Sequence, residues 1–339
     1  MSFTVILAKN EYSGALLDQI HEALDGMDYQ VSHTLDDAKG KLLFAVALDE
    51  CGCNEGYYHM LRRLRGDPAL LDGCTAGLVV TGQSELYTKS IARTLALSAN
   101  MAGCAFIGRP LVEATGSLRN FYTQAGIRGT DVHTAYRLAI RELAERLEEW
   151  EGPKTIRRVA AIHASVRRTS NTLALWGMVR QHLEQMEVAE YCLLNGAVAD
   201  CAGCSYTACM HFGKQGGCFY GGVMVDEVFP ALRNCDALVM LCANYNDALS
   251  ANLTAFVNRL TALFRQTRFY DKRLYGLVVS GYSGGDLVAQ QLLSSLNMNK
   301  SFYLPPYFAL LETANDAGSL IKQDGVEERT ELFAKRMMQ

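Results

Sequence analysis

The sequence predicts an α/β protein made of two tandem, doubly wound parallel-sheet domains. Three observations favour this fold: short apolar strands alternate with helical segments, a strong helix stop lies near the middle of the 339 residues, and segments of the two halves match at a nearly fixed offset. The length, about twice that of a typical domain, agrees with two domains. Hydrophobic residues make up 49% of the chain, which is enough to form folded cores.

Strands that alternate with helices are typical of a parallel sheet with helices on both faces. In the first half we expect strands over residues 3–8, 42–48 and 76–81. In the second half we expect strands over 157–162, 237–242 and 274–280, and helices over 171–186, 250–265 and 285–297. Each half therefore has the pattern of one doubly wound domain.

The boundary between the domains is expected at about residue 152. Residues 140–150 have the pattern of a helix, with Leu143, Leu147 and Trp150 on one stripe. Gly152 and Pro153 follow, a combination that ends a helix and turns the chain. We therefore expect one domain over residues 1–152 and a second over 153–339.

Two pairs of segments match at an offset of 199 residues. Gly77-Leu-Val-Val-Thr-Gly82 corresponds to Gly276-Leu-Val-Val-Ser-Gly281, and Leu111-Val-Glu-Ala-Thr115 corresponds to Leu310-Leu-Glu-Thr-Ala314. Asn100-Met101 also matches Asn297-Met298 after a slip of two residues. A period this long indicates duplicated domains and not a solenoid. The alternative is a chance likeness between valine-rich strands.

Charge and hydropathy exclude two classes of partner. The formal net charge of -4 gives no basic face for a row of phosphates, so we do not expect nucleic acid as a partner. The longest apolar runs, such as Leu42 to Leu48, are far shorter than the ~18 residues of a membrane span, and the first residues lack the features of a signal peptide. We therefore expect a cytoplasmic protein without membrane contact, in which disulfides do not explain the 11 cysteines.

A loop rich in hydroxyl groups follows the strand expected at 157–162. It reads His163-Ala-Ser-Val-Arg-Arg-Thr-Ser-Asn-Thr172 and leads into a helix. Backbone N–H groups at a helix N-terminus attract a phosphate, which hydroxyl groups and a cation can also bind. The side chains suited to this are Ser165, Arg167, Ser170 and Thr172. In the alternative interpretation, Ser170 or Asn171 only caps the helix.

This loop resembles the Gly-Ser-x-Arg-x-x-Ser-Asn-Thr loop that grips the FMN phosphate in flavodoxin-like NAD(P)H-dependent FMN reductases, with Ala164 in place of the glycine. Residues 243–259 are similar to the family's Pro-x-Tyr segment and the helix after it, with Ala243 and Thr254 replacing a proline and a lysine. Ser280-Gly-Tyr-Ser-Gly-Gly285 stands where relatives carry a glycine-rich turn beside the flavin. The resemblance covers about residues 155–320.

The resemblance implies a flavodoxin-like fold and an FMN site made by three loops at the carboxyl ends of strands. The phosphate would be held by Ser165, Arg167, Ser170, Asn171 and Thr172. The ring would lie along Asn244, Tyr245, Asn246 and Asp247, with Tyr245 as an aromatic wall, and beside Ser280, Gly281, Tyr282, Gly284 and Gly285. The alternatives are an ordinary core tyrosine at Tyr245 and a simple tight turn at the glycines.

Four cysteines fall within 18 residues of the second half: Cys201, Cys204, Cys209 and Cys218. Their spacing, C-x2-C-x4-C-x8-C, and the glycines between them suit a pliable loop that folds thiolates around a soft metal centre. Iron-sulfur flavoproteins, a subgroup of the family that the chain resembles, bind a [4Fe-4S] cluster in this region through more closely spaced cysteines. Because two gaps are wider here, a zinc site and a loop without metal are alternatives. We expect the other seven cysteines to be small buried hydrophobes.

The first half lacks the phosphate-binding set. Its first loop, Leu7 to Gly14, is shorter and contains Glu11, whose charge would repel a phosphate. The loop Asp49-Glu-Cys-Gly52 has no Asn-x-Tyr wall. Our hypothesis is a flavodoxin-like domain without an FMN site, which takes the place of a second subunit.

The expected function is that of an FMN-dependent oxidoreductase. Electrons would pass between reduced nicotinamide, NAD(P)H, or a ferredoxin-like donor, FMN, the [4Fe-4S] cluster and an acceptor that the sequence does not identify. The cofactors supply the chemistry, so no catalytic side chain is nominated. The alternative is a flavodoxin-like one-electron carrier or partner subunit with a zinc or unmetalled cysteine loop. A homodimer is compatible with the resemblance, since relatives assemble as dimers.

Overall fold

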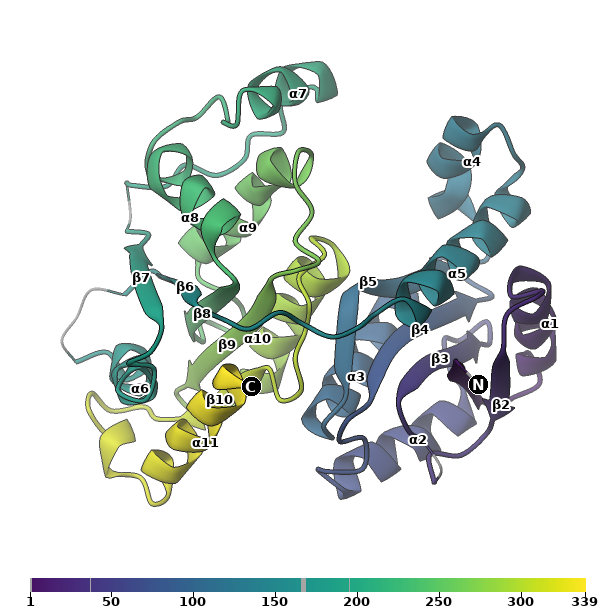
Figure 1. Cartoon of the computed structure of the whole chain (residues 1–339), viewed down its shortest axis with the longest axis horizontal. Coiled ribbons are helices and arrows are strands. Elements are labelled where there is room, and N and C mark those ends of the chain that lie inside the picture. The colour runs from purple at the N-terminus through teal and green to yellow at the C-terminus, as the bar shows by residue number, and fades with distance from the viewer. Residues whose placement is uncertain (1, 37, 166–168, 195) are drawn as a thin grey trace. The chain divides into compact units, whose positions relative to one another are not determined.

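The computed structural model describes residues 2–36, 38–165, 169–194 and 196–339. The chain divides into two compact units, Met1–Gly152 and Pro153–Gln339 (Figure 1). Within the described ranges, no helix is both long enough and apolar enough to cross a membrane.

The first unit is a five-stranded parallel sheet covered by helices. Its strands are β1 (Phe3–Ala8), β2 (Tyr29–Ser32), β3 (Lys41–Leu48), β4 (Thr75–Gly82) and β5 (Ala105–Ala114), in the order β2-β1-β3-β4-β5. Its helices are α1 (Ser13–Ala23), α2 (Glu55–Gly66), α3 (Thr88–Met101), α4 (Tyr122–Arg128) and α5 (Val132–Glu148), with a 3-10 turn, η1 (Arg119–Phe121), before α4. Helices α1 and α5 bury their apolar faces against alternate strand residues such as Leu43 and Ala45.

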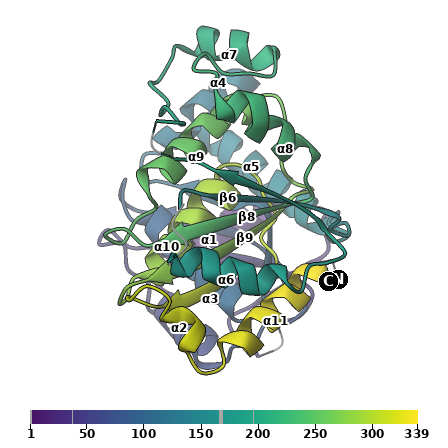
Figure 2. The same ribbon diagram turned by 90° about the vertical axis from the view of Figure 1, so that its left-hand side faces the viewer.

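The second unit has the same architecture. Its strands are β6 (Arg158–His163), β7 (Glu187–Cys192), β8 (Ala237–Ala243), β9 (Arg273–Ser280) and β10 (Ala309–Thr313), in the order β10-β9-β8-β6-β7. Its helices are α6 (Asn171–Arg180), α7 (Tyr206–Lys214), α8 (Phe229–Asn234), α9 (Ala251–Phe264), α10 (Gly285–Leu292) and α11 (Val326–Met338). The π-helical segments η2 (Met224–Val228) and η3 (Leu293–Met298) adjoin α8 and α10, and η4 (Leu320–Lys322) is a 3-10 turn. Helices α6 and α11 share one apolar core against the sheet (Figure 2).

Both sheets have the flavodoxin-like order. Counted along the chain within each unit, the strands stand in the order second, first, third, fourth, fifth, and every pair is parallel. The prediction of two tandem flavodoxin-like α/β domains is therefore confirmed.

The last two strands of both sheets also pair in the same register. In the first sheet Leu78 lies opposite Leu111, and in the second Leu277 lies opposite Leu310. These are the residues that match in the sequence at an offset of 199. Two residues further along, Val80 lies opposite Glu113 and Val279 lies opposite Glu312, in the same way. The similarity of the two halves thus extends from the sequence to the pairing of individual residues.

The helix expected over 171–186 is shorter than predicted. It ends at Arg180, after which His182 and Leu183 donate backbone hydrogen bonds to Val179 and Arg180 in tight turns. These turns direct the Leu183 side chain into the core, where it is 2% exposed. The residues that were predicted to form the last helical turns instead form tight turns that bury Leu183.

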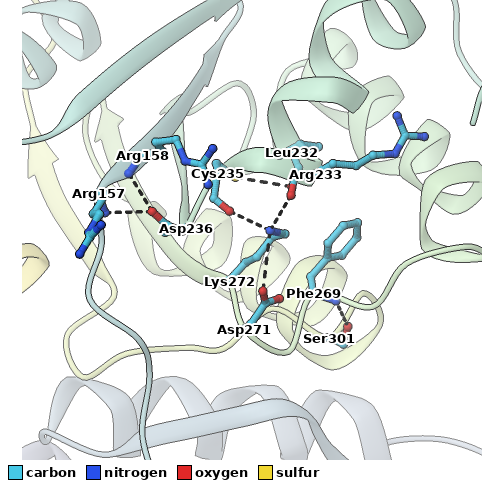
Figure 3. A network of polar contacts seen from close by, with 10 residues as sticks. All are labelled: Arg157, Arg158, Leu232, Arg233, Cys235, Asp236, Phe269, Asp271, Lys272 and Ser301. Carbon is cyan, nitrogen blue, oxygen red and sulfur yellow. Dashed lines mark hydrogen bonds and ion pairs between the residues drawn. The ribbon is translucent and has the colours of Figure 1, made fainter.

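Buried Lys272, just before β9, and Asp236, just before β8, bind the end of α8 and the start of β6 in the second unit (Figure 3). The ammonium group of Lys272 donates to the carbonyl oxygens of Cys235 (2.7 Å) and Arg233 (3.1 Å), at the end of α8. The carboxylate of Asp236 accepts the backbone N–H groups of Arg157 (2.9 Å) and Arg158 (2.8 Å) at the start of β6. These contacts fix the amino edge of the sheet, opposite the edge described next.

Candidate functional site

A cleft of about 590 Å³ opens at the carboxyl edge of the second sheet. Loops that follow β6, β8, β9 and β10 form its walls. Ligands bind to open parallel sheets at this edge, and a volume of this size suits a cofactor. The predicted binding residues that line the cleft are Ser165, Ser170, Asn171, Thr172, Asn244, Tyr245 and Gly281. Ala314, Asn315 and Ala317, in the loop after β10, also line it and were not predicted.

The first wall of the cleft is the start of α6. The hydroxyl oxygen of Ser170 accepts the backbone N–H of Leu173 (3.3 Å), so Ser170 caps the helix whose N-terminus faces the cleft. Capping and ligand binding are thus compatible at this residue, because a hydroxyl group can accept one hydrogen bond and donate another. Arg167, the predicted countercharge, lies outside the described residues.

Asn171 uses its side chain to hold the loops of the cleft together. Its amide nitrogen donates to the carbonyl oxygens of Ala314 (3.2 Å) and Asp316 (2.9 Å), and its oxygen accepts the N–H of Gly318 (3.0 Å). These bonds occupy both polar ends of the amide. Asn171 therefore positions the start of α6 against the loop after β10, and its side chain is not directed to a phosphate.

Asn244 joins the loops that follow β8 and β9. Its side-chain nitrogen donates to the hydroxyl of Ser280 (3.2 Å) and to the carbonyl oxygen of Ser283 (2.9 Å). Its side-chain oxygen is buried and has no hydrogen-bond partner among the described residues. A buried acceptor without a donor is unfavourable, so this oxygen is suited to accept an N–H group from a ligand in the cleft, such as the imide N–H of a flavin ring.

Asn246 and Asp247 form the turn that presents Tyr245. Both have positive φ values, 52° and 59°, and Tyr245 and Ala248 exchange two backbone hydrogen bonds of 3.1 Å across them. This is the geometry of a two-residue hairpin of type I′, in which asparagine and aspartate are favoured. The Tyr245 side chain is 56% exposed, so the alternative of a core tyrosine is wrong.

The glycine-rich turn after β9 packs against this hairpin. Gly284 has a φ of 81°, and a Cβ atom there would lie 2.0 Å from the Asp247 carboxylate. Ser280 is 1% exposed, and its hydroxyl oxygen accepts the hydrogen bond from the Asn244 amide. Tyr282 is 81% exposed, and its hydroxyl oxygen accepts a hydrogen bond from Asn315 (3.1 Å). The remaining predicted residues lie outside the cleft lining and shape it indirectly: Asn246, Asp247, Ser280, Tyr282, Gly284 and Gly285.

The predicted cysteine ligands do not meet at one point. Cys201 and Cys204 are exposed, and Cys209 and Cys218 are half-buried. The pKa of the Tyr220 hydroxyl is raised by desolvation and by the neighbouring thiols of Cys204, Cys201 and Cys218, of which Cys204 is also its hydrogen-bond partner. Cys209, in contrast, lies on α7. In the part of the chain that the structure describes, no three His, Cys, Asp or Glu side chains are arranged to hold a metal ion. The thiols as placed therefore do not fit a cluster.

The other seven cysteines fall into three groups: four are buried, Cys192 is half-buried, and Cys51 and Cys53 are exposed. Burial raises the pKa of Cys235 to about 11, and Cys74, Cys104 and Cys242 are likewise buried, as expected. Cys51 and Cys53 are exposed, so the expectation of buried thiols is wrong for this pair. Their backbone N–H groups donate to the Asp49 carboxylate at 2.9 and 2.8 Å, which draws the loop outward after β3.

Three carboxylates lie close to Tyr12 in the loops after β1 and β3 of the first sheet. The carboxylates of Glu11, Glu50 and Asp49, together with burial, raise the pKa of the Tyr12 hydroxyl. These side chains follow β1 and β3, the strands that correspond by position to β6 and β8. Carboxylates in these two loops repel a phosphate.

Comparisons with known proteins locate the likeness in the second unit. The family model described as NADPH-dependent FMN reductase matches residues 157–316, the segment that carries the cleft. None of the curated proteins matches this chain.

Solved structures of flavin-related proteins resemble part of the chain. RosB with a bound riboflavin-phosphate intermediate has 13% identity and a TM-score of 0.44, over 54% of this chain and 77% of its own. An NAD(P)H:quinone oxidoreductase from Methanothermobacter marburgensis has 15% identity and a TM-score of 0.40, over 54% and 95%. The apo form of an NADH:FMN oxidoreductase has 17% identity and a TM-score of 0.38, over 54% and 88%.

The family match covers the cleft loops that follow β6, β8 and β9, and it ends at residue 316, within the loop that follows β10. It supports the predicted enzyme class. The second unit thus matches the NADPH-dependent FMN reductase family, in agreement with a flavin-dependent NAD(P)H oxidoreductase.

Proposed function

We propose that the cleft of the second unit binds FMN and that the protein is an FMN-dependent NAD(P)H oxidoreductase. One observation carries this proposal: the three sequence segments that resemble the FMN reductases all contribute to a single cleft, within the residues that match the family. The start of α6 offers hydroxyl and backbone donors for a phosphate, and Tyr245 offers an exposed aromatic face for a ring.

The protein residues bind and orient, and bound FMN would supply the hydride and electron chemistry. Ser165, Ser170 and Thr172 would donate hydroxyl hydrogen bonds to the phosphate at the start of α6. The unpaired oxygen of Asn244 would accept an N–H group of the ring. Tyr245 would cover one ring face and exclude water from it.

The first test is whether flavin binding depends on the phosphate at the predicted place. Ser170→Ala with Thr172→Val should weaken the binding of FMN to the flavin-free protein by about tenfold, because two hydroxyl donors are lost, and leave the binding of riboflavin unchanged. Fluorescence titration with both flavins measures this. An equal loss for both flavins would mean that the start of α6 does not hold the phosphate.

The second test concerns the donor. Purified protein should carry flavin absorption bands, and NADPH or NADH should bleach them under anaerobic conditions. Bleaching by a reduced ferredoxin alone would instead support the alternative of a one-electron carrier. From the sequence we also propose that the protein forms a homodimer and is located in the cytoplasm. The sequence does not identify the electron acceptor.

For the cysteine loop we propose a [4Fe-4S] cluster on Cys201, Cys204, Cys209 and Cys218. The spacing of these cysteines in the sequence supports it. Cys209 would have to leave its present place on α7. Analysis of iron, acid-labile sulfide and zinc in anaerobically purified protein decides between the cluster, a zinc site and an unmetalled loop.

We also propose that the first unit binds no FMN. The carboxylates of Glu11, Asp49 and Glu50 lie in the two loops that correspond to the phosphate and ring loops of the second unit, and they disfavour a phosphate there. The full chain should therefore bind one FMN per polypeptide. A stoichiometry of two would contradict this proposal without affecting the assignment of the cleft in the second unit.

A further inference from the structure

A pocket of about 270 Å³ lies in the first unit, at the carboxyl ends of β1 and β2. Three segments form it: the end of β1 with the residue after it, the loop after β2, and helix α2. This is the edge of an open parallel sheet at which ligands bind. The residues that define this β2 pocket are Ala8, Lys9, His33, Thr34, Leu35, Asp36, Gly56, His59, Met60 and Arg63.

One stripe of α2 forms a wall of the β2 pocket. Residues three or four apart lie on the same side of a helix, as is the case for Gly56, His59, Met60 and Arg63. Gly56 lies so close to the end of β1 that a Cβ atom there would be 2.4 Å from the backbone nitrogen of Lys9, and its N–H donates to the Lys9 carbonyl (3.2 Å). In the loop after β2, Nδ1 of His33 donates to the carbonyl oxygen of Leu7 (3.3 Å). Both walls are therefore fixed to the end of β1.

The floor of the β2 pocket is apolar and its rim is cationic. The buried floor residues are Ala8, Leu35 and Met60. The exposed rim residues are Lys9, His33, His59 and Arg63. Among the described residues that line the pocket, Asp36 is the single acid, and its carboxylate is paired with the Arg63 guanidinium (2.9 Å). Two permanent cations and two histidines outnumber it, although the whole chain has a net charge of -4. The pocket is thus complementary to an anion with an apolar body.

The backbone at the start of α2 does not form a phosphate site. The N–H of Gly56 is bonded to the Lys9 carbonyl, and the N–H of Tyr57 donates to the side-chain oxygen of Asn54 (2.7 Å). Because these donors are in use, the groups left to bind an anion are the cationic side chains. A guanidinium group binds a carboxylate through two parallel hydrogen bonds, without help from the backbone.

We propose that the β2 pocket binds a small organic carboxylate, with its apolar body on the buried floor and its carboxylate at Lys9 and Arg63. The volume of the pocket is less than half the 590 Å³ of the flavin cleft, which suits a ligand with few carbon atoms. Asp36 holds Arg63 through an exposed ion pair, a weak contact that an incoming carboxylate can replace. The first unit is then a ligand-binding domain, and this assignment does not depend on the flavin.

The first experiment titrates the flavin-free full chain with hexanoate, followed by ligand-observed nuclear magnetic resonance. Hexanoate should bind saturably, and uncharged hexanamide should bind at least about tenfold more weakly, because it brings no charge to the cationic rim. Butyrate, which has two fewer CH₂ groups to bury, should also bind about tenfold more weakly. Equal binding of hexanoate and hexanamide, or no saturable binding, would overturn the proposal. Displacement of hexanoate by FMN would also overturn it, since the β2 pocket is separate from the flavin cleft.

Two neighbouring arginines of α2 locate the bound carboxylate in the same assay. Arg63→Met should weaken hexanoate binding by about tenfold. Arg62→Met is the matched control and should leave binding unchanged, because Arg62 is also exposed but lines a separate groove beside α3. Asp36→Asn releases Arg63 and should strengthen binding about two- to fivefold.

These three side chains are exposed, so the variants should fold, which circular dichroism checks. Equal losses in Arg62→Met and Arg63→Met would refute a carboxylate bound at Arg63. Unchanged or weaker binding in Asp36→Asn would refute it as well, because removal of a competing carboxylate can only favour an anionic ligand at this position.

Discussion

The side-chain amide of Asn244 donates a hydrogen bond to the hydroxyl of Ser280 across 3.2 Å. Together with the bond to the Ser283 carbonyl, it ties the two loops that would enclose the flavin ring. Asn244→Ala removes these bonds and the unpaired acceptor in the cleft. We expect FMN affinity to fall about 10- to 100-fold, since each lost hydrogen bond to a buried group costs about 1–3 kcal/mol. Fluorescence titration of the flavin-free protein measures the change.

Asn252 provides the matched control for this prediction. Its side-chain nitrogen also donates to a backbone carbonyl, that of Leu193 (2.6 Å), but it does not line the cleft. Asn252→Ala should lower stability by about 1 kcal/mol and leave FMN affinity within a factor of two. If both variants lose flavin equally, general loosening of the unit explains the effect and Asn244 has no special role.

A methyl group at position 284 should disrupt the ring side of the cleft. Gly284→Ala would place a Cβ atom 2.0 Å from the Asp247 carboxylate, at a φ of 81° that disfavours any side chain. The hairpin that presents Tyr245 must then shift, and we expect weaker FMN binding. Gly177→Ala is the control, because its Cβ would meet no atom within 4 Å on α6 and alanine favours a helix by up to about 1 kcal/mol. Calorimetry should therefore show a lower melting temperature for Gly284→Ala and an equal or higher one for Gly177→Ala. Flavin titration should show weaker FMN binding for Gly284→Ala alone.

His163, at the end of β6, should make the cleft sensitive to acid. Burial lowers its pKa below the ordinary value of 6.5, and its Nδ1 accepts the backbone N–H of Ser165 (3.3 Å). The folded state thus favours the neutral ring, so its stabilising contribution is complete above pH 6.5 and is lost as the pH falls through the lowered pKa. FMN affinity should decrease over the same range, because a protonated ring cannot accept this bond. His163→Gln, which does not titrate, should flatten the profile; an unchanged profile would contradict the role of His163.

The sequence predicts the centre of each sheet better than its edges. Buried strands such as β3 and β8 are short, nearly continuous apolar runs, a pattern typical of a strand that is buried on both faces. None of the four edge strands, β2, β5, β7 and β10, was predicted. Most residues of β2 and β7 are half-buried or exposed, and their sequences, such as Glu-Val-Ala-Glu-Tyr-Cys, lack an apolar run. In β5 the apolar run is interrupted by Gly108, Arg109 and Pro110, and β10 has only five residues. The segments that match at an offset of 199 residues could be recognised from the sequence alone. They lie in β4 and β5 of the first sheet and in β9 and β10 of the second, which pair in the same register.

For the candidate site, the sequence predicts which loops meet but not the direction of each side chain. The amide of Asn171 faces the loop after β10, and Gly284 makes room for Asp247. These directions depend on contacts between segments that are far apart in the sequence. Asn315 was missed for the same reason, since nothing near it in the chain marks it as part of the cleft.

Two buried asparagines occupy matching positions in the two units and should stabilise each unit separately. Asn100 donates to the Cys104 carbonyl (2.9 Å), and Asn297 donates to the Phe302 carbonyl (2.7 Å). Replacing either with alanine leaves a buried carbonyl without this donor, at a cost of about 1–3 kcal/mol. Calorimetry should show one altered transition for Asn100→Ala and the other for Asn297→Ala. A shift of the same transition by both variants would mean that the chain does not unfold as two units.

The ammonium group of Lys272 should be essential for stability but not for flavin binding (Figure 3). Lys272 is 5% exposed, and its ammonium group donates to two carbonyl oxygens at the end of α8, at the edge of the sheet opposite the cleft. Lys272→Met keeps most of the side-chain volume but leaves both carbonyls without this donor, so the free energy of unfolding of the second unit should fall by about 2–4 kcal/mol. Lys214→Met, at an exposed position on α7, should have little effect. At a temperature where both variants are folded, their FMN affinities should equal that of the unmodified protein. A selective loss of FMN affinity in Lys272→Met would show that the amino edge of the sheet influences the cleft.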